Sequence, residues 1–365
     1  MVNKYLIEIA LITLITFVFT ALIMPGMIKI AKHINAMDVP RDNRRVHTKP
    51  MPKLGGLGIF LGFLFGYMLF GVHSIQMNSI LIGSFIIIIT GIIDDINPIK
   101  PRYKLLGQIC AACTIIFYGN IYLNEVTAFG QVFKFGILAY PITLVFIIGC
   151  INVINLIDGL DGLSGGIASI FLATMGIIAF VQGRQATLEI TLIFIMLGAT
   201  TGFLLHNFNP AKIFAGDTGS MFMGFIIAVV SLLGFKGAMF LSFVIPLAVL
   251  AIPILDTLFA IVRRMLKKQP IFEADKDHMH HQFLKMNFTQ RQTVLIIYLI
   301  NILFSAAAIF FTLGDAKKAM IIYFVLLALT IWFILHTGIL SQSMSNKIKQ
   351  LEDRFKIQSK SKKQK

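Results

Sequence analysis

The sequence predicts an all-α, polytopic membrane protein of about 11 transmembrane helices, with the N-terminus outside the cell and the C-terminus in the cytoplasm. Three observations predict this class: 57% of the 365 residues are hydrophobic, only 13% are charged, and the mean hydropathy is +0.82. A soluble domain of this size would have to expose much of its apolar surface to water. Lipid is therefore the expected solvent.

The apolar runs are long enough to cross a bilayer, and short polar segments separate them. The first run far exceeds the apolar region of a cleavable signal peptide, which spans about 7–15 residues. It contains Pro25-Gly26, where we expect the helix to bend. In order, the eleven expected spans are Tyr5–Ile30, Leu54–Val72, Met77–Ile93, Leu105–Gly119, Ile137–Ile154, Leu163–Val181, Leu188–Leu205, Ser220–Leu233, Ala238–Val262, Val294–Leu313 and Ala319–Leu335.

The distribution of basic residues predicts the orientation. With the N-terminus outside, the basic segments around Arg44, Arg102 and Arg263 and the C-terminal tail all fall in the cytoplasm, where membrane proteins carry an excess of Lys and Arg. The net charge of +15 then reflects topology, and nucleic acid is not an expected partner. The basic residues left outside are Lys4, Lys134, Arg184, Lys236, Lys317 and Lys318.

The segments outside the spans are short. The longest external one, Asn120–Gly136, alternates apolar and polar residues and predicts a small β-hairpin. We expect residues 1–340 to form a single transmembrane catalytic domain and residues 341–365 to form a basic cytoplasmic tail. Three apolar residues at helical spacing in the tail fit an amphipathic helix on anionic lipid, and a disordered solvated tail fits equally well.

Polar residues gather at the expected cytoplasmic ends of the spans. Asp94-Asp95 ends the third span, and Asn and Asp recur every third residue from Asn152 to Asp161 at the end of the fifth. An adjacent acid pair favours a bound cation because its charges repel each other, although such a pair alone can simply be a solvated helix end. The candidate site residues are Asp94, Asp95, Lys104, Asn152, Asn155, Asp158, Asp161, Asn207, Phe214, Asp217, His278, His280 and His281.

Asp217 precedes the eighth expected span, in Phe214-Ala-Gly-Asp-Thr-Gly-Ser220. Backbone N–H groups at a helix N-terminus favour phosphate, and an acid beside an anion site implies a bridging metal. Mg²⁺ is the expected cofactor, with Mn²⁺ as a substitute, because Mg²⁺ combines a few carboxylates with substrate phosphate oxygens. His278-Met-His-His281 could bind zinc, but its basic surroundings suit phosphate equally well.

Carboxylates, amides, bases and histidines at one membrane surface favour transfer of a phosphoryl-linked group from a soluble nucleotide to a membrane lipid. The main alternative is an ion-coupled secondary transporter, since acids within a membrane also form proton relays. A transporter would place its acids near the midplane on two repeated halves, and no internal repeat is visible here. A scaffold for envelope assembly leaves the polar clusters unexplained.

From about Val46 to His281 the chain resembles the polyprenyl-phosphate N-acetylhexosamine-1-phosphate transferase family. This resemblance implies that a UDP-amino sugar reacts with undecaprenyl phosphate at the cytoplasmic face of the cell membrane, releasing UMP. The motifs that carry it are Pro52-Lys-Leu-Gly-Gly56, Asp94-Asp95 with Arg102-Tyr-Lys104, Asn152-Val-Ile-Asn-Leu-Ile-Asp-Gly-Leu-Asp-Gly162, Asn207 through Asp217-Thr-Gly-Ser220, and His278-Met-His-His281.

The resemblance also implies residue roles. Asp94 matches the candidate base for the lipid phosphate, Asp95 its partner near the metal and phosphates, and Asp217 the Mg²⁺ ligand. A phosphate monoester is already largely ionised near pH 7, so Asp94 could instead orient the lipid phosphate. The residues that match positions near the nucleoside are Asn155, Asp158, Asp161 and Phe214. Asn207 matches a polar position of the active site. The residues that match positions facing phosphate or sugar are Lys104, His278, His280 and His281.

Within the family, Met279 interrupts the histidines, as in the branch that transfers GlcNAc-1-phosphate and initiates wall teichoic acid or other envelope polysaccharides. A contiguous histidine triplet is typical of the alternative, the phospho-MurNAc-pentapeptide transferase of peptidoglycan synthesis. The Lys-, Ile- and Asn-rich composition suits a low-GC Gram-positive bacterium and so favours teichoic acid. UDP-GlcNAc and undecaprenyl phosphate are the expected substrates, and a homodimer is left open.

Overall fold

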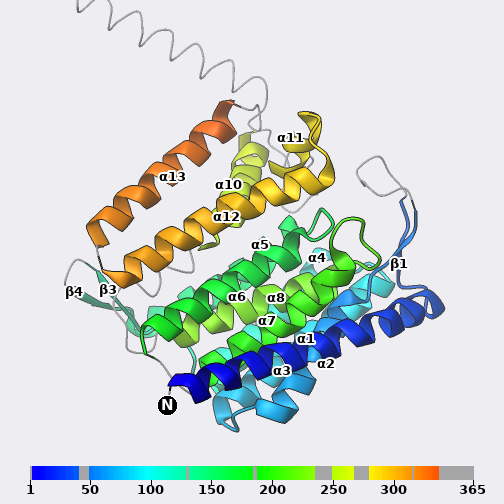
Figure 1. Cartoon of the computed structure of the whole chain (residues 1–365), viewed down its shortest axis with the longest axis horizontal. Coiled ribbons are helices and arrows are strands. Elements are labelled where there is room, and N and C mark those ends of the chain that lie inside the picture. Colours follow the sequence, from blue (N-terminus) through cyan, green and yellow to red (C-terminus); the bar gives the residue numbers. More distant parts are fainter. Residues whose placement is uncertain are drawn as a thin grey trace, which may run out of the picture.

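The computed structural model describes residues 2–40, 49–128, 131–183, 187–234, 249–266, 279–314 and 316–336, which are mainly helical. The long helices run side by side as a bundle (Figure 1). A π-helical turn continues α4 over Thr114–Tyr118. The helices are α1 (Val2–His33), α2 (Gly55–Phe70), α3 (Ile75–Ile96), α4 (Pro101–Cys113), α5 (Ala139–Ile157), α6 (Leu163–Val181), α7 (Leu188–Asn207), α8 (Gly216–Gly234), α10 (Ala251–Leu266), α11 (Met279–Lys285), α12 (Gln290–Leu313) and α13 (Ala316–His336).

Among the described residues, seven helices are long and apolar enough to cross a membrane: α1, α3, α5, α6, α7, α8 and α12. Helix α2 and the Lys318–Trp332 part of α13 are apolar but shorter. Large apolar side chains such as Leu22 and Met68 are 74% and 80% exposed, which is favourable only against lipid. The chain is therefore a multi-pass membrane protein.

The prediction of a mainly helical membrane protein is confirmed, and each expected span except the ninth coincides with a described helix. The ninth, Ala238–Val262, overlaps the start of α10, while residues 235–248 lie outside the described residues. The predicted tail, 341–365, also lies outside them. Helix α11 carries part of the histidine motif and was not predicted, because its seven residues show no long apolar run.

The predicted β-hairpin is present. Strands β3 (Glu125–Ala128) and β4 (Gln131–Lys134) pair antiparallel, as the alternation of apolar and polar residues indicated. A second antiparallel pair, β1 (Met37–Asp38) with β2 (Met51–Pro52), was not predicted, since two-residue strands leave no periodic signal. The second pair brings the segment after α1 to the N-terminus of α2, where the polar site is built.

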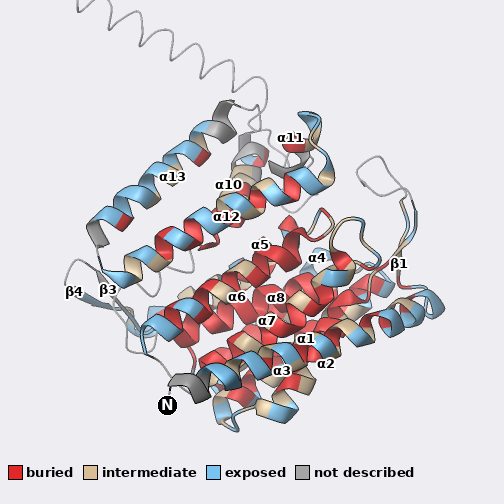
Figure 2. Cartoon of the chain, viewed as in Figure 1, coloured by how far each residue is buried: buried red, intermediate tan, exposed pale blue. Residues whose placement is uncertain are grey.

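Helix α8 is the centre of the bundle. Its residues from Thr218 to Gly234 are all buried, and it packs against α2, α3, α5 and α6. Figure 2 shows the buried residues concentrated on α6 and α8, while exposed residues cover the outward faces of α1 and α13. A helix that is apolar on every side is expected inside a bundle. Its neighbours therefore fix the N-terminus of α8 at one end of the molecule.

Helices α2 and α8 approach each other closely through glycine. A Cβ atom at Gly56 would overlap the backbone of Gly219, and one at Gly91 of α3 would overlap the backbone of Thr218. Small residues allow membrane helices to pack with their backbones in contact. The Gly55-Gly56 pair thus has a structural reason: it lets α2 lie directly against the first turn of α8.

We expect Gly56→Ala to lower the free energy of unfolding by about 1–3 kcal/mol, because the added methyl group overlaps backbone that cannot move without shifting α8. Thermal unfolding in detergent measures this change. Gly149→Ala on α5 is the control, since its methyl group would meet no described atom within 4 Å. A Gly56 variant as stable as the Gly149 variant would contradict this close approach.

Candidate active site

The last turn of α3 carries two buried acids, Asp94 and Asp95, beside the first turn of α8. Asp95 accepts hydrogen bonds from the backbone N–H of Asp217 at 3.0 Å and from the backbone N–H and hydroxyl of Thr218 at 3.0 and 2.6 Å. The first N–H groups of a helix have no partner within it. A carboxylate from α3 therefore caps α8, and the helix dipole favours its negative charge.

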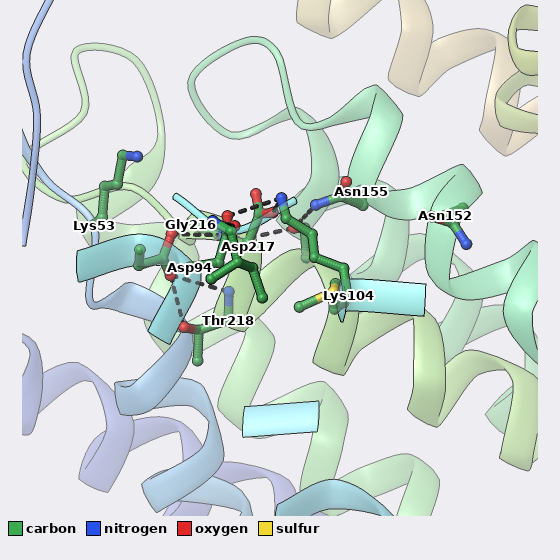
Figure 3. A network of polar contacts seen from close by, with 12 residues as sticks. Lys53, Asp94, Lys104, Asn152, Asn155, Gly216, Asp217 and Thr218 are labelled. Atoms are coloured by element: carbon green, nitrogen blue, oxygen red, sulfur yellow. Dashed lines mark hydrogen bonds and ion pairs between the residues drawn. The ribbon is translucent and has the colours of Figure 1, made fainter. Parts of the chain in front are cut away.

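The Lys104 ammonium lies between the carboxylates of Asp94 and Asp217 (Figure 3). Its Nζ lies 2.8 Å from Asp94 Oδ2 and also contacts Asp217 Oδ2, while Asp94 Oδ1 accepts the N–H of Ile99 at 2.9 Å. Burial opposes the charge on Lys104, but the carboxylates of Asp217 and Asp94 outweigh it and raise the Lys104 pKa. Two carboxylates thus flank the Lys104 ammonium, and the third, Asp95, lies beside them against the start of α8.

The chain before α8 is held against the N-terminus of α2. The N–H of Phe214 donates to the carbonyl of Pro52 at 2.8 Å, and the N–H of Gly55 donates to the carbonyl of Phe214 at 2.9 Å. Gly216 follows with a φ of +68°, and a Cβ there would overlap the Asp95 carboxylate. Glycine is required at such a position. The Pro52–Gly56 motif therefore supports the site through its backbone.

The two asparagines of α5 have different neighbours. Asn155 Nδ2 donates to Ser220 Oγ in the first turn of α8 at 2.8 Å, so Asn155 lies next to Asp217 (Figure 3). Asn152 points elsewhere and donates through Nδ2 to Gln108 Oε1 of α4 at 2.8 Å. The structure thus brings Asn155 to the carboxylate cluster, whereas Asn152 fastens α4 to α5.

Asp158 ends α5 and is partly buried beside the cluster. Burial, together with the nearby charges of Asp217 and Asp95, raises the pKa of Asp158 to about 7, although the Ser164 hydroxyl, which donates to Asp158 Oδ1 at 2.5 Å, opposes this rise. The carboxyl group of Asp158 therefore exchanges a proton near neutral pH, unlike an exposed aspartate.

Asp161 and Asn207 connect the loop between α5 and α6 to the chain after α7. Asp161 Oδ2 accepts hydrogen bonds from Asn209 Nδ2 at 2.9 Å and from the backbone N–H of Ala211 at 3.0 Å, both in the segment after α7. Asn207 is buried; its Oδ1 accepts the N–H of Gly162 at 3.0 Å and its Nδ2 donates to the carbonyl of Ile213 at 2.9 Å. Asn207 thus positions two backbone segments, with both ends of its amide already engaged.

Three predicted residues belong to the histidine motif. His278 lies outside the described residues, and His280 and His281 lie in α11, where only the backbone is described. Their roles stay predictions. Phe214 is half-buried at the turn before α8, and stacking of its ring on a base also stays a prediction.

Thr218 and Ser220 stand in the motif around Asp217 but were not among the candidate site residues, and neither was Gln108; all three bond to site residues. Two signals could have found them. Hydroxyl residues directly after an acid at a helix start commonly take part in capping, which marks Thr218 and Ser220. A lone amide inside an apolar run is costly in a membrane unless it is paired, which marks Gln108.

The donor set fits a hard divalent cation. The ammonium of Lys104 already lies between oxygens of Asp94 and Asp217, so a cation is stable at this position, and carboxylate oxygens are the ligands that Mg²⁺ prefers. Both Asp95 oxygens face α8 instead. Within the described part of the chain, no group of three or more His, Cys, Asp or Glu residues could hold a metal by itself.

A bundle of membrane-spanning helices with buried carboxylates at the helix ends is the arrangement expected of an enzyme embedded in a membrane. The chain belongs to glycosyl transferase family 4, whose family model matches residues 77–235. This stretch includes Asp94, Asp95, Lys104 and Asp217, and together with a relative that is 39% identical over 90% of the chain it confirms the family predicted from the sequence motifs.

Individual relatives sharpen this assignment. The chain is 39% identical, over 90% of its length and 91% of the relative, to the probable undecaprenyl-phosphate N-acetylglucosaminyl 1-phosphate transferase of Bacillus subtilis strain 168. It is 32% identical to the decaprenyl-phosphate N-acetylglucosaminephosphotransferase of Mycobacterium tuberculosis H37Rv, over 86% of both chains. It is 28% identical to the undecaprenyl-phosphate alpha-N-acetylglucosaminyl 1-phosphate transferase of Escherichia coli K12, over 82% and 81%.

We expect Thr218→Val to lower the free energy of unfolding by about 1–2 kcal/mol, because it removes the hydroxyl that donates to the buried Asp95 carboxylate and keeps the side-chain shape. Thermal unfolding in detergent is the measurement. Thr174→Val is the matched control, since among the described residues that buried hydroxyl bonds only to a carbonyl of its own helix. Equal stability of the two variants would argue against the cap.

Proposed function

We propose that this protein transfers GlcNAc-1-phosphate from UDP-GlcNAc to undecaprenyl phosphate, giving undecaprenyl-diphospho-GlcNAc and UMP. A lipid phosphate oxygen attacks the sugar-bearing phosphorus, and the bond from that phosphorus to the bridging oxygen breaks. The observation that carries the proposal is the ammonium of Lys104 between Asp94 and Asp217 at the start of α8, in a chain 39% identical to the Bacillus subtilis relative.

Each residue around the reacting phosphates has a separate role, which follows from its position. Lys104 neutralises phosphate charge, Asp94 orients the lipid phosphate or takes its proton, and Asp95 holds the α8 N-terminus in place. Asp217, with Asp95 behind it, would hold Mg²⁺, or Mn²⁺ in its place. When bound, this ion would neutralise charge on the diphosphate and so favour departure of UMP. His278, His280 and His281 complete the phosphate- and sugar-facing side.

The nucleoside side of the site consists of the loops at the ends of α5 and α7. Asn155, Asp158, Asp161 and Asn207 line this side, and Phe214 offers a ring on which uracil stacks. Asn152 lies one turn before Asn155 on α5 and supports this side indirectly, by its hydrogen bond to Gln108 of α4. This assignment is supported by two hydrogen bonds: Asn155, near the end of α5, donates to Ser220 of α8, and Asn207, at the end of α7, donates to the carbonyl of Ile213 just before α8.

For the topology, we infer eleven spans in the plasma membrane, with the N-terminus outside and the active site on the cytoplasmic face. The support is the excess of Lys and Arg on that face and the meeting of helix ends that this arrangement places there: the ends of α3 and α5 and the start of α8. The reaction then serves as the first membrane step of wall teichoic acid or a related envelope polysaccharide.

The test is UMP release by the purified protein in detergent, supplied with undecaprenyl phosphate, Mg²⁺ and either UDP-GlcNAc or UDP-MurNAc-pentapeptide. We expect release with UDP-GlcNAc alone. Release only with the pentapeptide donor would keep the reaction class and overturn the assigned sugar. Silence with both donors, from folded protein, would reject the transferase and favour the transporter.

We expect Asp217→Asn to lower kcat roughly 100-fold or more, because the amide cannot replace a charged oxygen ligand. Titration of Mg²⁺ against initial rate measures this loss and the accompanying shift in metal requirement. Glu125→Gln, the same chemical change at an exposed residue of strand β3, should behave as the unmodified protein. Normal Mg²⁺-dependent rates from the Asp217 variant would remove it as the metal ligand.

A further inference from the structure

The loop that contains Asp158 and Asp161 leads into α6, whose N-cap residue is a glycine and so has no side chain to cap the helix. Gly162 is the N-cap residue of α6, with a left-handed φ of +83° and no side chain to accept the first N–H groups. Its own N–H donates to Asn207 Oδ1 at 3.0 Å. Its carbonyl accepts the N–H of Gly166 at 2.9 Å, which leaves one lone pair of that oxygen for a second donor.

The second donor comes from a distant helix. The hydroxyl of Tyr298, on α12, donates to the Gly162 carbonyl. Tyr298 reaches this carbonyl because Gly166, one turn along α6, has no side chain: a Cβ there would overlap the phenol ring and its oxygen. Gly162 is thus held on both sides, with its N–H bound by α7 and its carbonyl by α12.

The first turn of α12 adds two contacts to the chain after α7. Gln290 Oε1 accepts from Asn209 Nδ2 at 3.1 Å, and the same amide donates to Asp161. The guanidinium of Arg291 lies 5.7 Å from the centre of the Phe208 ring. Helix α12 therefore touches both loops of the nucleoside side, although it lies outside the stretch matched by the family model.

We propose that Tyr298 is a positioning residue for recognition of the nucleotide donor: its hydroxyl fixes the Gly162 carbonyl and so sets the loop that presents Asp158 and Asp161. This inference rests on the proposed function, because it takes these two acids as the nucleoside-facing groups. No sequence motif indicated a role for Tyr298, because it lies within an apolar run of residues.

The test is Tyr298→Phe, which removes the hydroxyl and keeps the ring. We expect KM for UDP-GlcNAc to rise roughly three- to tenfold, the effect of losing one hydrogen bond, while KM for undecaprenyl phosphate and kcat change less than twofold. We also expect faster hydrogen–deuterium exchange in the peptide spanning residues 158–166. Gly166→Ala should raise the same KM, because its methyl group displaces the phenol.

Tyr323→Phe is the matched control; this partly buried tyrosine of α13 packs its ring against Phe304, and its variant should keep both the KM and the exchange pattern of the unmodified protein. Unchanged exchange over residues 158–166 in the Tyr298 variant would overturn the proposal. So would faster exchange with an unchanged donor KM, or equal losses towards both substrates. An inactive unmodified protein would instead reject the proposed function, and the exchange experiment would still report on the contact.

Discussion

The Asp95 carboxylate joins the end of α3 to the start of α8 through three hydrogen bonds, and the site depends on this connection. An unpaired charge buried at this depth would be strongly unfavourable. The unbonded N–H groups at the start of α8 would be unfavourable as well. Each group satisfies the other, so the two helices meet in one register, and that register places Asp217 beside Asp94 and Lys104.

The balance of charge in the cluster follows from this geometry. The cluster holds three carboxyl groups and one ammonium, and the N-terminus of α8 favours the charged form of the carboxyl groups beside it. A phosphate group would find the ammonium but also two repelling carboxylates. This repulsion supports the proposal that the phosphate substrates arrive with a divalent cation.

Much of the fold could be predicted from the sequence, because span length and apolar periodicity are properties of single segments. The hairpin β3–β4 was visible for the same reason. The site could be predicted as a set of residues but not as a geometry: nothing local indicates that Asp95 caps a helix more than 120 residues later, or that Asn152 turns away towards Gln108. Such pairings depend on which helices become neighbours, and a single sequence does not encode that information in any one segment.

The long sequence separation between Asp95 and its donors has a consequence for synthesis. Thr218 is made 123 residues after Asp95, which at about 5–20 residues per second is a delay of roughly 6 to 25 seconds on the ribosome. During this interval α3 is already made, while the Asp95 carboxylate still lacks its hydrogen-bond donors on α8. The carboxylate can wait only where water reaches it. Its place on the last turn of a span thus meets a demand of co-translational insertion as well as one of the finished enzyme.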